Sequence, residues 1–330
     1  MKVVLFLRKP YPGQHSIERV YSSLLPFLAN KVNFQVCIMP FESKGIVRRV
    51  LNAMYAGLKR GDVNHISGDI NYIAVFLPKK GSILTVHDIY PVYTYKGLRK
   101  KIFEYLWFKL PISRVQQIIF ISEFTCSEVV ARYNVSRSKY ITIANSVSPE
   151  FFYQQKIEQK NDPPILLQIG VKKNKNLLRV VEALAGFNCR LIIVGKPTPI
   201  QKAKMKRRGI IYDYFESVSN KELNDLYALS DLVLFVSTYE GFGLPIIEAQ
   251  ATGRPVLTSN VASMPEIAGR GALLVNPYSV EQIRKGVKKI LKDEKFSAEL
   301  VVLGQENIKR FNPRDIGEKY LRVYKKVASS

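Results

Sequence analysis

The chain has little of several residue types that mark particular classes of protein. Its 330 residues include three cysteines, three histidines and one tryptophan. Cys37, Cys126 and Cys189 are far apart and lack the paired spacing of a zinc site or a redox motif, so we expect buried thiols. No apolar run approaches the roughly 18 residues that a membrane span needs. A disulfide scaffold and a transmembrane protein are therefore both unexpected.

The amino terminus also lacks the pattern of a secretory signal. The opening MKVVLFLRKP has a five-residue apolar run before Arg8 and Lys9. That run is too short for a signal peptide and is typical of a first buried strand. We therefore predict a cytoplasmic protein, with peripheral contact at the inner face of the membrane as a second expectation.

Acidic residues are in short supply. The chain has 50 Lys and Arg residues against 27 Asp and Glu residues, a formal net charge of +23. The excess is spread along the chain, with 21 − 9 = +12 in residues 1–150 and 29 − 18 = +11 in residues 151–330. Such a field favours anionic partners, namely nucleic acid, anionic lipid headgroups or phosphorylated small molecules. No nucleic-acid motif accompanies the charge, so nucleic acid is not expected, and a solvated basic surface is the plainer alternative.

The length of the chain suits two domains. Short β-branched runs alternate with helical patterns such as NLLRVVEALAG and LPIIEAQATG. The expected strands are VVLFL, FQVCIM, DVNHIS, SILTVHD and QIIFIS in the first half, and PILLQIG, CRLIIVG, GIIYDYF, DLVLFVS and PVLTS in the second. Near-continuous apolar strands separated by helices predict an α/β protein with two Rossmann-like, doubly wound units, whose parallel sheets are covered on both faces.

The boundary between the units is expected in FFYQQKIEQKNDPP, residues 151–164, which is polar and ends in two prolines. This predicts an amino-terminal domain over residues 1–155 and a carboxyl-terminal domain over residues 163–310. The last helix, residues 311–330, either closes the second unit or folds back on the first. Two such domains facing across a cleft would bind ligands at the carboxyl ends of their strands.

Two glutamates eight residues apart lie in STYEGFGLPIIEAQATGRP, residues 237–255. Pro245 and the glycines before it predict a helix that begins near Leu244. Glu240 would then lie in a strand-end loop and Glu248 in the first helical turn, and the bend between them would let both face one ligand. The N–H groups of a helix start attract a diphosphate, and carboxylates accept hydrogen bonds from sugar hydroxyls. The alternative is that Glu240 caps the helix and Glu248 complements its dipole.

A lysine-rich loop occurs in LQIGVKKNKNLLRVVEAL, residues 167–184. Lys172, Lys173 and Lys175 follow a strand and precede an amphipathic helix that Asn176 is expected to cap. Ammonium groups beside a helix amino terminus favour phosphate binding. A solvated lysine cluster at a helix start is the alternative.

The histidines all lie at or near strand ends of the amino-terminal half. His87, in SILTVHD, is followed by Asp88, and an imidazole there can hydrogen-bond a sugar hydroxyl. His65 and Asp69, one strand earlier, are a second pair of ligand candidates, and His15 is a third. The alternative for each histidine is a purely structural role.

The segment YTYKGLRKKIFEYLWFKLPISR, residues 93–114, interleaves aromatic with cationic residues. Spacing by four predicts one helix face against the sheet and lysines outside. The expected inward residues are Leu98, Ile102, Leu106 and Leu110, and the expected outward ones are Lys100, Lys101 and Lys109. The additional aromatic residues suit an interfacial contact with an anionic membrane, and an ordinary covering helix is the alternative.

STYEGFGLPIIEAQATGRPVLTSN, followed by MPEI and GALLVNP, resembles the signature of glycosyltransferase family 4, with its E-x(7)-E motif, EGFGLP loop and G-x-P-V strand. The resemblance extends through the carboxyl-terminal half and more loosely to the amino-terminal half. It implies the GT-B fold and a retaining, metal-independent transfer of a sugar from a nucleotide-diphosphate sugar to a glycan or lipid-linked acceptor. It implies no cofactor, and it implies a place in cell-surface polysaccharide or glycolipid synthesis.

The resemblance also implies roles by position. Glu248 would bind the donor ribose, and Glu240 would lie against the donor sugar. His87, in a T-x-H-D strand end, would face the donor sugar and the scissile bond. Lys175 matches the family's diphosphate lysine. The family's preceding arginine has no match, so Lys172 or Lys173 would replace it as point charges. The remaining positions are Gly241, Phe242, Gly243 and Leu244, whose backbone would meet the sugar and diphosphate, Val218, whose backbone would pack on the base, and Gly13, in a loop near the donor phosphate and acceptor.

Glu240, His87 and Lys175 are thus the candidate catalytic residues. Two other classes of function stay open at the level of sequence. A nucleotide-sugar epimerase of the GT-B type would share the architecture and need no acceptor, and a basic protein that only binds anionic ligands would share the charge.

Overall fold

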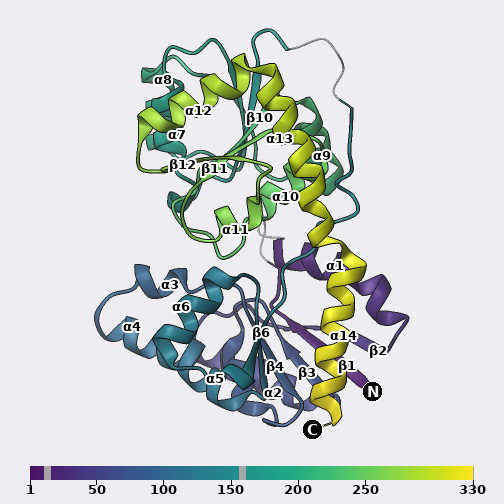
Figure 1. The fold of residues 1–330 in the computed structure, drawn as a ribbon. Helices are drawn as coiled ribbons and strands as arrows, with labels where there is room; N and C mark the ends of the chain where they lie inside the picture. The colour runs from purple at the N-terminus through teal and green to yellow at the C-terminus, as the bar shows by residue number, and fades with distance from the viewer. Residues whose placement is uncertain (11–15, 156–160, 330) are drawn as a thin grey trace. The chain divides into compact units, whose positions relative to one another are not determined.

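The computed structural model describes residues 1–10, 16–155 and 161–329 (Figure 1). The chain forms two compact units, and each is treated by itself below. The N-terminal unit comprises Met1–Ser146 together with Pro313–Ser330, and the C-terminal unit comprises Val147–Asn312. The last stretch of the chain is therefore part of the first unit. His15 and Gly13 lie outside the described residues.

The N-terminal unit has a six-stranded parallel sheet in the order β2-β1-β3-β4-β5-β6. Its strands are β1 (Lys2–Leu7), β2 (Asn33–Ile38), β3 (Val63–Ile66), β4 (Ser82–Val86), β5 (Gln117–Phe120) and β6 (Tyr140–Thr142). Its helices are α1 (Ser16–Ala29), α2 (Ile46–Leu58), η1 (Asn71–Phe76), α3 (Tyr90–Thr94), α4 (Gly97–Glu104), η2 (Tyr105–Lys109), α5 (Leu110–Arg114), α6 (Glu123–Tyr133), η3 (Arg137–Lys139) and α14 (Pro313–Ser329).

The C-terminal unit repeats this plan, with strand order β12-β11-β10-β7-β8-β9 and parallel pairing. Its strands are β7 (Ile165–Ile169), β8 (Arg190–Val194), β9 (Ile211–Phe215), β10 (Leu232–Phe235), β11 (Val256–Ser259) and β12 (Leu273–Val275). Its helices are η4 (Lys173–Lys175), α7 (Leu177–Leu184), α8 (Pro199–Arg207), α9 (Asn220–Leu229), α10 (Leu244–Ala251), α11 (Met264–Ala268), α12 (Val280–Lys292), α13 (Glu294–Asn307) and η5 (Ile308–Phe311). The predicted α/β class with two doubly wound units is confirmed.

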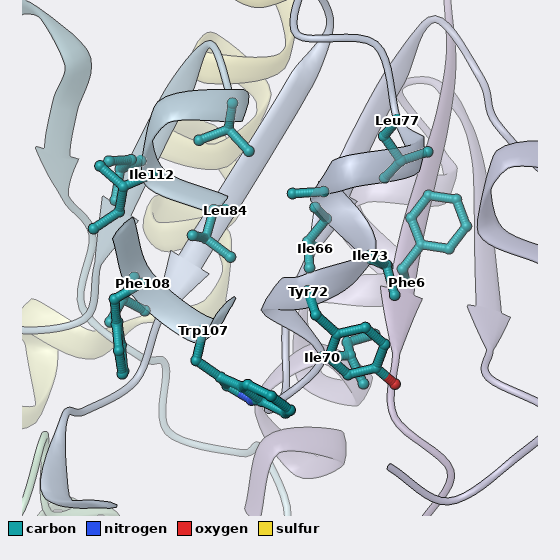
Figure 2. Close-up of a cluster of buried hydrophobic side chains, with 14 of the residues drawn as sticks. Phe6, Ile66, Ile70, Tyr72, Ile73, Leu77, Leu84, Trp107, Phe108 and Ile112 are labelled. Carbon is teal, nitrogen blue, oxygen red and sulfur yellow. The ribbon is translucent and has the colours of Figure 1, made fainter. Parts of the chain in front are cut away.

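The first strand shows why its sequence is apolar throughout. Alternate side chains of a strand point to opposite faces of a sheet. Val4 and Phe6 enter the core on one face, whereas Val3, Leu5 and Leu7 enter the core on the other. Figure 2 shows the first of these cores, in which side chains of the sheet and of the covering helices meet. Its labelled members are Phe6, Ile66, Ile70, Tyr72, Ile73, Leu77, Leu84, Trp107, Phe108 and Ile112.

Helix α14 covers the opposite face of the same sheet and lies beside α1 (Figure 1). Ile316, Tyr320 and Tyr324 are almost completely buried there. The helices approach closely because Gly317 has no side chain: a Cβ at this position would lie 2.5 Å from Cδ1 of Phe27. The helix at the end of the chain thus supplies one wall of the first unit's core.

Residues 93–114 are helical except for Tyr95 and Lys96, but the expected inward face is wrong. Leu98 and Ile102 are 72% and 51% exposed, while Trp107 and Phe108 are buried. The π-helical stretch η2 widens one turn, so the residues in and after it do not continue the spacing by four that begins at Leu98 and Ile102. Leu106 and Leu110 are half-buried, Lys101 and Lys109 are exposed as expected, and Lys100 is half-buried.

The cysteines are free thiols. Cys126 and Cys189 are buried as expected, and Cys37 on the edge strand β2 is only half-buried. The sequence patterns missed β6 and β12, which are three residues long each and carry no strong alternation.

Candidate functional site

The loop between β10 and α10 places the first glutamate as the sequence predicted. Helix α10 begins at Leu244, and Gly243 before it has φ of 113°, a left-handed conformation that suits glycine. Glu240 lies in the strand-end loop. Glu248 is the fifth helical residue, so it stands just past the first turn in which it was expected.

Glu240 is paired with a cation from another strand-end loop of the same unit. Its Oε1 lies 2.8 Å from Nζ of Lys175, and the two side chains are 15% and 19% exposed. Asn174 Nδ2 donates a hydrogen bond of 3.1 Å to the same carboxylate oxygen. A pair this poorly solvated is screened less than a surface pair. The structure therefore brings together Glu240 and Lys175, which are 65 positions apart in the sequence.

Backbone contacts hold the glutamate loop in one conformation. Asn174 accepts a hydrogen bond from the N–H of Thr238 at 2.8 Å and donates to the carbonyl of Tyr239 at 3.0 Å. Ser263 Oγ lies 2.9 and 2.6 Å from the carbonyl oxygens of Glu240 and Phe242, so its hydroxyl is shared between them. Sequence reasoning missed Asn174 and Ser263, because neither stands in a recognisable motif. The loop is organised before any ligand arrives.

Phe242 acts as an anchor for this loop. Its side chain is 4% exposed and packs edge-to-face against Phe311, with ring centroids 5.8 Å apart. A buried side chain leaves the backbone at this position as the part available to a ligand. This geometry is compatible with the backbone role that was predicted for residues 241–244.

The side chain of Lys175 lies beside a glycine, and its ammonium lies over an aromatic ring. Gly170 has φ of +87°, and a Cβ there would lie 3.0 Å from Cγ of Lys175. The ammonium lies 4.5 Å from the ring centroid of Phe235. Lys172 and Lys173, by contrast, are exposed. Among the three lysines of this loop, Lys175 is the one with a fixed position.

The prediction that Asn176 caps α7 with its side chain is wrong. Asn176 adopts a left-handed conformation with φ of 61°, and no side-chain capping bond forms. Its amide instead donates to the carbonyl oxygens of Val236, at 3.0 Å, and Pro277, at 2.7 Å. The buried asparagine ties the lysine loop to the chain that follows β10 and to the loop after β12.

Glu248 is buried, with 5% of its surface exposed. It accepts a hydrogen bond of 2.8 Å from the hydroxyl of Tyr227 on α9. The carbonyl of Tyr227 accepts from Arg254 Nε at 3.1 Å, and burial lowers the pKa of Arg254. Tyr227 and Arg254 were not found from sequence, because an aromatic residue on a helix and an arginine after a glycine carry no distinctive signal. Val218 is half-buried in the loop that leads into α9.

His87 lies in the N-terminal unit, at the end of β4. Its Nε2 is 2.7 Å from Ser67 Oγ, which in turn accepts a hydrogen bond of 2.9 Å from the hydroxyl of Tyr21. Burial is the main cause that lowers its pKa to about 4; the Arg8 guanidinium adds to the effect and the Asp69 carboxylate opposes it. The imidazole is therefore neutral at physiological pH. Asp69 itself is paired with Arg8 at 3.2 Å.

The prediction of a ligand role for His65 is wrong. The ring is completely buried, with Nδ1 2.9 Å from the Tyr324 hydroxyl and Nε2 2.7 Å from Thr85 Oγ1. Both ring nitrogens are thus engaged within the protein. Burial lowers the pKa of His65 to about 3. His65 connects α14 to the sheet.

These two histidines predict loss of stability in acid. Their pKa values of about 3 and about 4 lie below the unfolded value of about 6.5. Between about pH 6.5 and pH 4 the unfolded chain binds more protons than the folded chain, so the free energy of unfolding rises with pH and falls on acidification. Trp107, the single tryptophan, reports on the N-terminal unit. We expect its fluorescence to give a falling urea midpoint from pH 6.5 to pH 4, with a flatter dependence in His65→Gln. Equal slopes would contradict the assignment.

Residues 1–10, 16–155 and 161–329 contain no group of three or more His, Cys, Asp or Glu side chains arranged to hold a metal ion. In the same part of the chain, no helix is both long and apolar enough to cross a bilayer.

Comparison with known families identifies the chain. The model for glycosyl transferases group 1 matches residues 150–306, and the model for Glycosyltransferase Family 4 matches residues 16–151. The chain belongs to glycosyltransferase family 4. The chain has the GT-B fold that the resemblance implied.

The relatives of this chain include bacterial mannosyltransferases. The O-antigen chain mannosyltransferase RfbU of Salmonella typhimurium is 28% identical over 222 residues, which is 64% of this chain and 61% of RfbU. The O-antigen chain mannosyltransferase B of Escherichia coli is 26% identical over 267 residues, which is 74% of this chain and 68% of that protein. The match thus spans less than two thirds of the length of RfbU.

Solved structures share the fold over nearly the whole chain. Sucrose-phosphate synthase from Thermosynechococcus elongatus superposes with a TM-score of 0.79 at 16% identity, over 100% of both chains. HepE from Anabaena, solved with UDP and glucose, gives a TM-score of 0.78 at 15% identity, over 98% of this chain and 99% of HepE. At these identities the likeness concerns the fold.

Proposed function

We propose that this family 4 protein is a retaining glycosyltransferase that moves a sugar from a nucleotide-diphosphate sugar to a glycan or lipid-linked acceptor in cell-surface polysaccharide or glycolipid synthesis. The observation that carries the proposal is the preorganised Lys175–Glu240 pair beside α10 in a chain that both family models match. The O-antigen mannosyltransferases among its relatives support the polysaccharide pathway. Cytoplasmic location stays a prediction.

In this proposal the donor is held by the C-terminal unit. Glu248 accepts hydrogen bonds from the ribose, Glu240 from the sugar, and the backbone of residues 241–244 meets the sugar and diphosphate. Val218 packs on the base. Lys175 neutralises the charge that develops on the leaving diphosphate, with Lys172 and Lys173 as outer point charges, so no metal is needed for that task.

The chemical step that we propose is a front-face displacement. The bond from the anomeric carbon to the diphosphate oxygen breaks, and the acceptor oxygen bonds that carbon from the same face. The proton of the acceptor hydroxyl passes to the departing phosphate oxygen. His87, held neutral by burial and positioned by Ser67, hydrogen-bonds a hydroxyl of the reacting sugar in this scheme.

A cavity in the N-terminal unit supports an amphiphilic acceptor. Its volume is about 790 Å³, and both apolar and cationic side chains line it. Arg49 lies 4.6 Å from the ring centroid of Trp107, and Arg99 lies 4.3 Å from that of Tyr95. Leu98, Ile102 and Leu106 complete an apolar side. Stacked guanidinium groups beside apolar side chains suit an acceptor that joins a phosphate to a lipid or sugar.

The proposal predicts that a nucleotide sugar stabilises the folded protein. A ligand at about 100 times its Kd adds about 2.7 kcal/mol to the free energy of unfolding, which raises the Tm by several degrees. We expect such a shift in a thermal panel of nucleotide sugars that includes mannose and glucose donors, and we expect Glu248→Ala to reduce it to half or less. No shift with any donor would contradict the proposal. Conversion of the donor to an epimer without an acceptor would favour the epimerase instead.

A further inference from the structure

Two buried hydroxyl groups of the N-terminal unit form a hydrogen-bonded chain that ends at His87. Tyr21 on α1 is 2% exposed, and its hydroxyl donates to Ser67 Oγ at 2.9 Å. Ser67 directly follows β3 and is completely buried, and its Oγ lies 2.7 Å from Nε2 of His87. The His87 side chain is only half-buried. The chain of hydrogen bonds therefore runs from the core of the unit to a ring that a ligand can reach.

The direction of these bonds follows from where each proton can go. Tyr21 donates to Ser67, so the Ser67 hydroxyl needs another acceptor for its own proton. Within residues 1–10, 16–155 and 161–329, the other group that bonds Ser67 Oγ is His87 Nε2. A buried hydroxyl whose proton meets no acceptor is unfavourable, because it has lost its hydrogen bond to water. Ser67 therefore donates, and His87 Nε2 accepts.

This direction determines which nitrogen of His87 carries the proton. Burial lowers the pKa of His87 to about 4, so the imidazole is neutral at physiological pH and has one N–H group. Because Nε2 accepts, that proton is on Nδ1. The nearby Asp69 carboxylate is paired with Arg8 at 3.2 Å. Nothing in the described part of the chain hydrogen-bonds Nδ1, so its N–H is available to a ligand.

His87 also borders space that a ligand can enter. It lines a small cavity of about 20 Å³ at the end of β4. A cavity of this size holds about one water-sized group. Four lining residues are shared with the cavity of about 790 Å³: Asp69, Pro91, Phe103 and Trp107. The histidine therefore adjoins the larger cavity of the same unit.

We propose that Tyr21 and Ser67 are positioning residues that hold His87 in its Nδ1–H tautomer, so that His87 offers a hydrogen-bond donor to the reacting sugar. In this tautomer Nδ1 cannot accept the proton of an acceptor hydroxyl, and Nε2 is engaged by Ser67. His87 is then a donor to a ligand oxygen and not a general base. Its action on a sugar rests on the proposed function, whereas the tautomer does not.

Nitrogen NMR of the imidazoles tests the tautomer in the full chain without any ligand. The chain has three histidines, and the spectrum of His87→Asn identifies the His87 signals by their absence. At neutral pH we expect a protonated, pyrrole-type Nδ1 and an unprotonated, pyridine-type Nε2. In Ser67→Ala the Nε2 atom loses its donor, so the Nε2–H form should become populated and the two shifts should converge. Tyr21→Phe should move them in the same direction by less. A pyrrole-type Nε2 in wild type would overturn the proposal.

Tyr324→Phe is the matched control for these variants. It also removes a buried hydroxyl that bonds a histidine, in this case 2.9 Å from Nδ1 of His65. It should shift the His65 signals and leave the His87 signals as they are in wild type. If Tyr324→Phe changed the His87 tautomer as much as Ser67→Ala did, loosening of the core would explain both results and the positioning role would be wrong.

Kinetics test the use of the N–H in catalysis. Ser67→Ala should lower kcat by about two- to tenfold, the effect of one neutral hydrogen bond, with a smaller change in KM for the donor. Because the amide nitrogen of asparagine can replace Nδ1 and that of glutamine can replace Nε2, His87→Asn should retain more activity than His87→Gln. The reverse order would overturn the donor role. The expected tautomer in a protein that binds no nucleotide sugar would support the positioning role and contradict the proposed function alone.

Discussion

Replacing Lys175 with alanine is expected to lower the rate of sugar transfer by about 10²- to 10³-fold. The reason is electrostatic: among the described residues the Lys175 ammonium is the cation positioned beside Glu240, and loss of a single preorganised group that stabilises developing charge has effects of this size. Because the donor diphosphate would still meet the helix start and Lys172 or Lys173, the KM for the donor should change less than kcat. Steady-state release of nucleoside diphosphate gives both constants.

A structural explanation of the same loss can be tested separately. Lys175→Ala leaves the Glu240 carboxylate without its cation, and the uncompensated charge would lower the rate as well if it disrupted the loop. The double variant Lys175→Ala/Glu240→Gln removes the uncompensated charge and should recover Tm but not the rate. Lys196→Ala is the control: it breaks another pair at 2.8 Å in the same unit, but its partners, Lys196 and Glu216, are 65% and 50% exposed. A normal rate in Lys175→Ala would remove this lysine from the mechanism.

The second large effect is expected at Glu248, and it concerns donor binding rather than the chemical step. A buried carboxylate that accepts from a ligand hydroxyl contributes a charge-assisted hydrogen bond of about 1.5–3 kcal/mol. Glu248→Ala should therefore raise the Kd for nucleoside diphosphate and nucleotide sugar by roughly 10- to 100-fold. Isothermal titration measures this directly, because nucleoside diphosphate binding requires no turnover.

Tyr227→Phe provides a graded version of this test. The hydroxyl donates to Glu248 at 2.8 Å, so its removal deletes one hydrogen bond that positions the carboxylate and keeps the carboxylate itself. A neutral hydrogen bond contributes about 0.5–1.5 kcal/mol, and the Kd should rise by about two- to tenfold. In Glu248→Ala, the additional change Tyr227→Phe should have no further effect on Kd. Additive losses would show that Tyr227 acts on the donor by another route.

The sequence allowed most of the sheet to be predicted. Strands such as β1 and β10 are buried on both faces, and a run of apolar residues between helical patterns is a strong signal for that environment. The start of α10 was also predictable, because Pro245 and Gly243 have backbone requirements that few other structures satisfy. These features depend on local residue properties alone.

Features that depend on tertiary contacts could not be predicted in this way. The π-helical stretch η2 breaks the spacing by four on which the burial of Ile102 was predicted, and nothing in the residue spacing indicates it. Asn176 is of a residue type that often caps helices, but its buried side chain instead hydrogen-bonds two other loops of the same unit.

The placement of α14 has a consequence for the order in which the two units fold during synthesis. Tyr320 and Tyr324 complete the core beneath β1 and β3, yet the ribosome adds them only after all of the C-terminal unit. Domains tend to fold as they emerge during synthesis. Here the first unit to emerge lacks α14, so one face of its sheet stays uncovered until the end of synthesis. The second unit can fold as soon as it has emerged. The nascent chain therefore completes its second unit before its first.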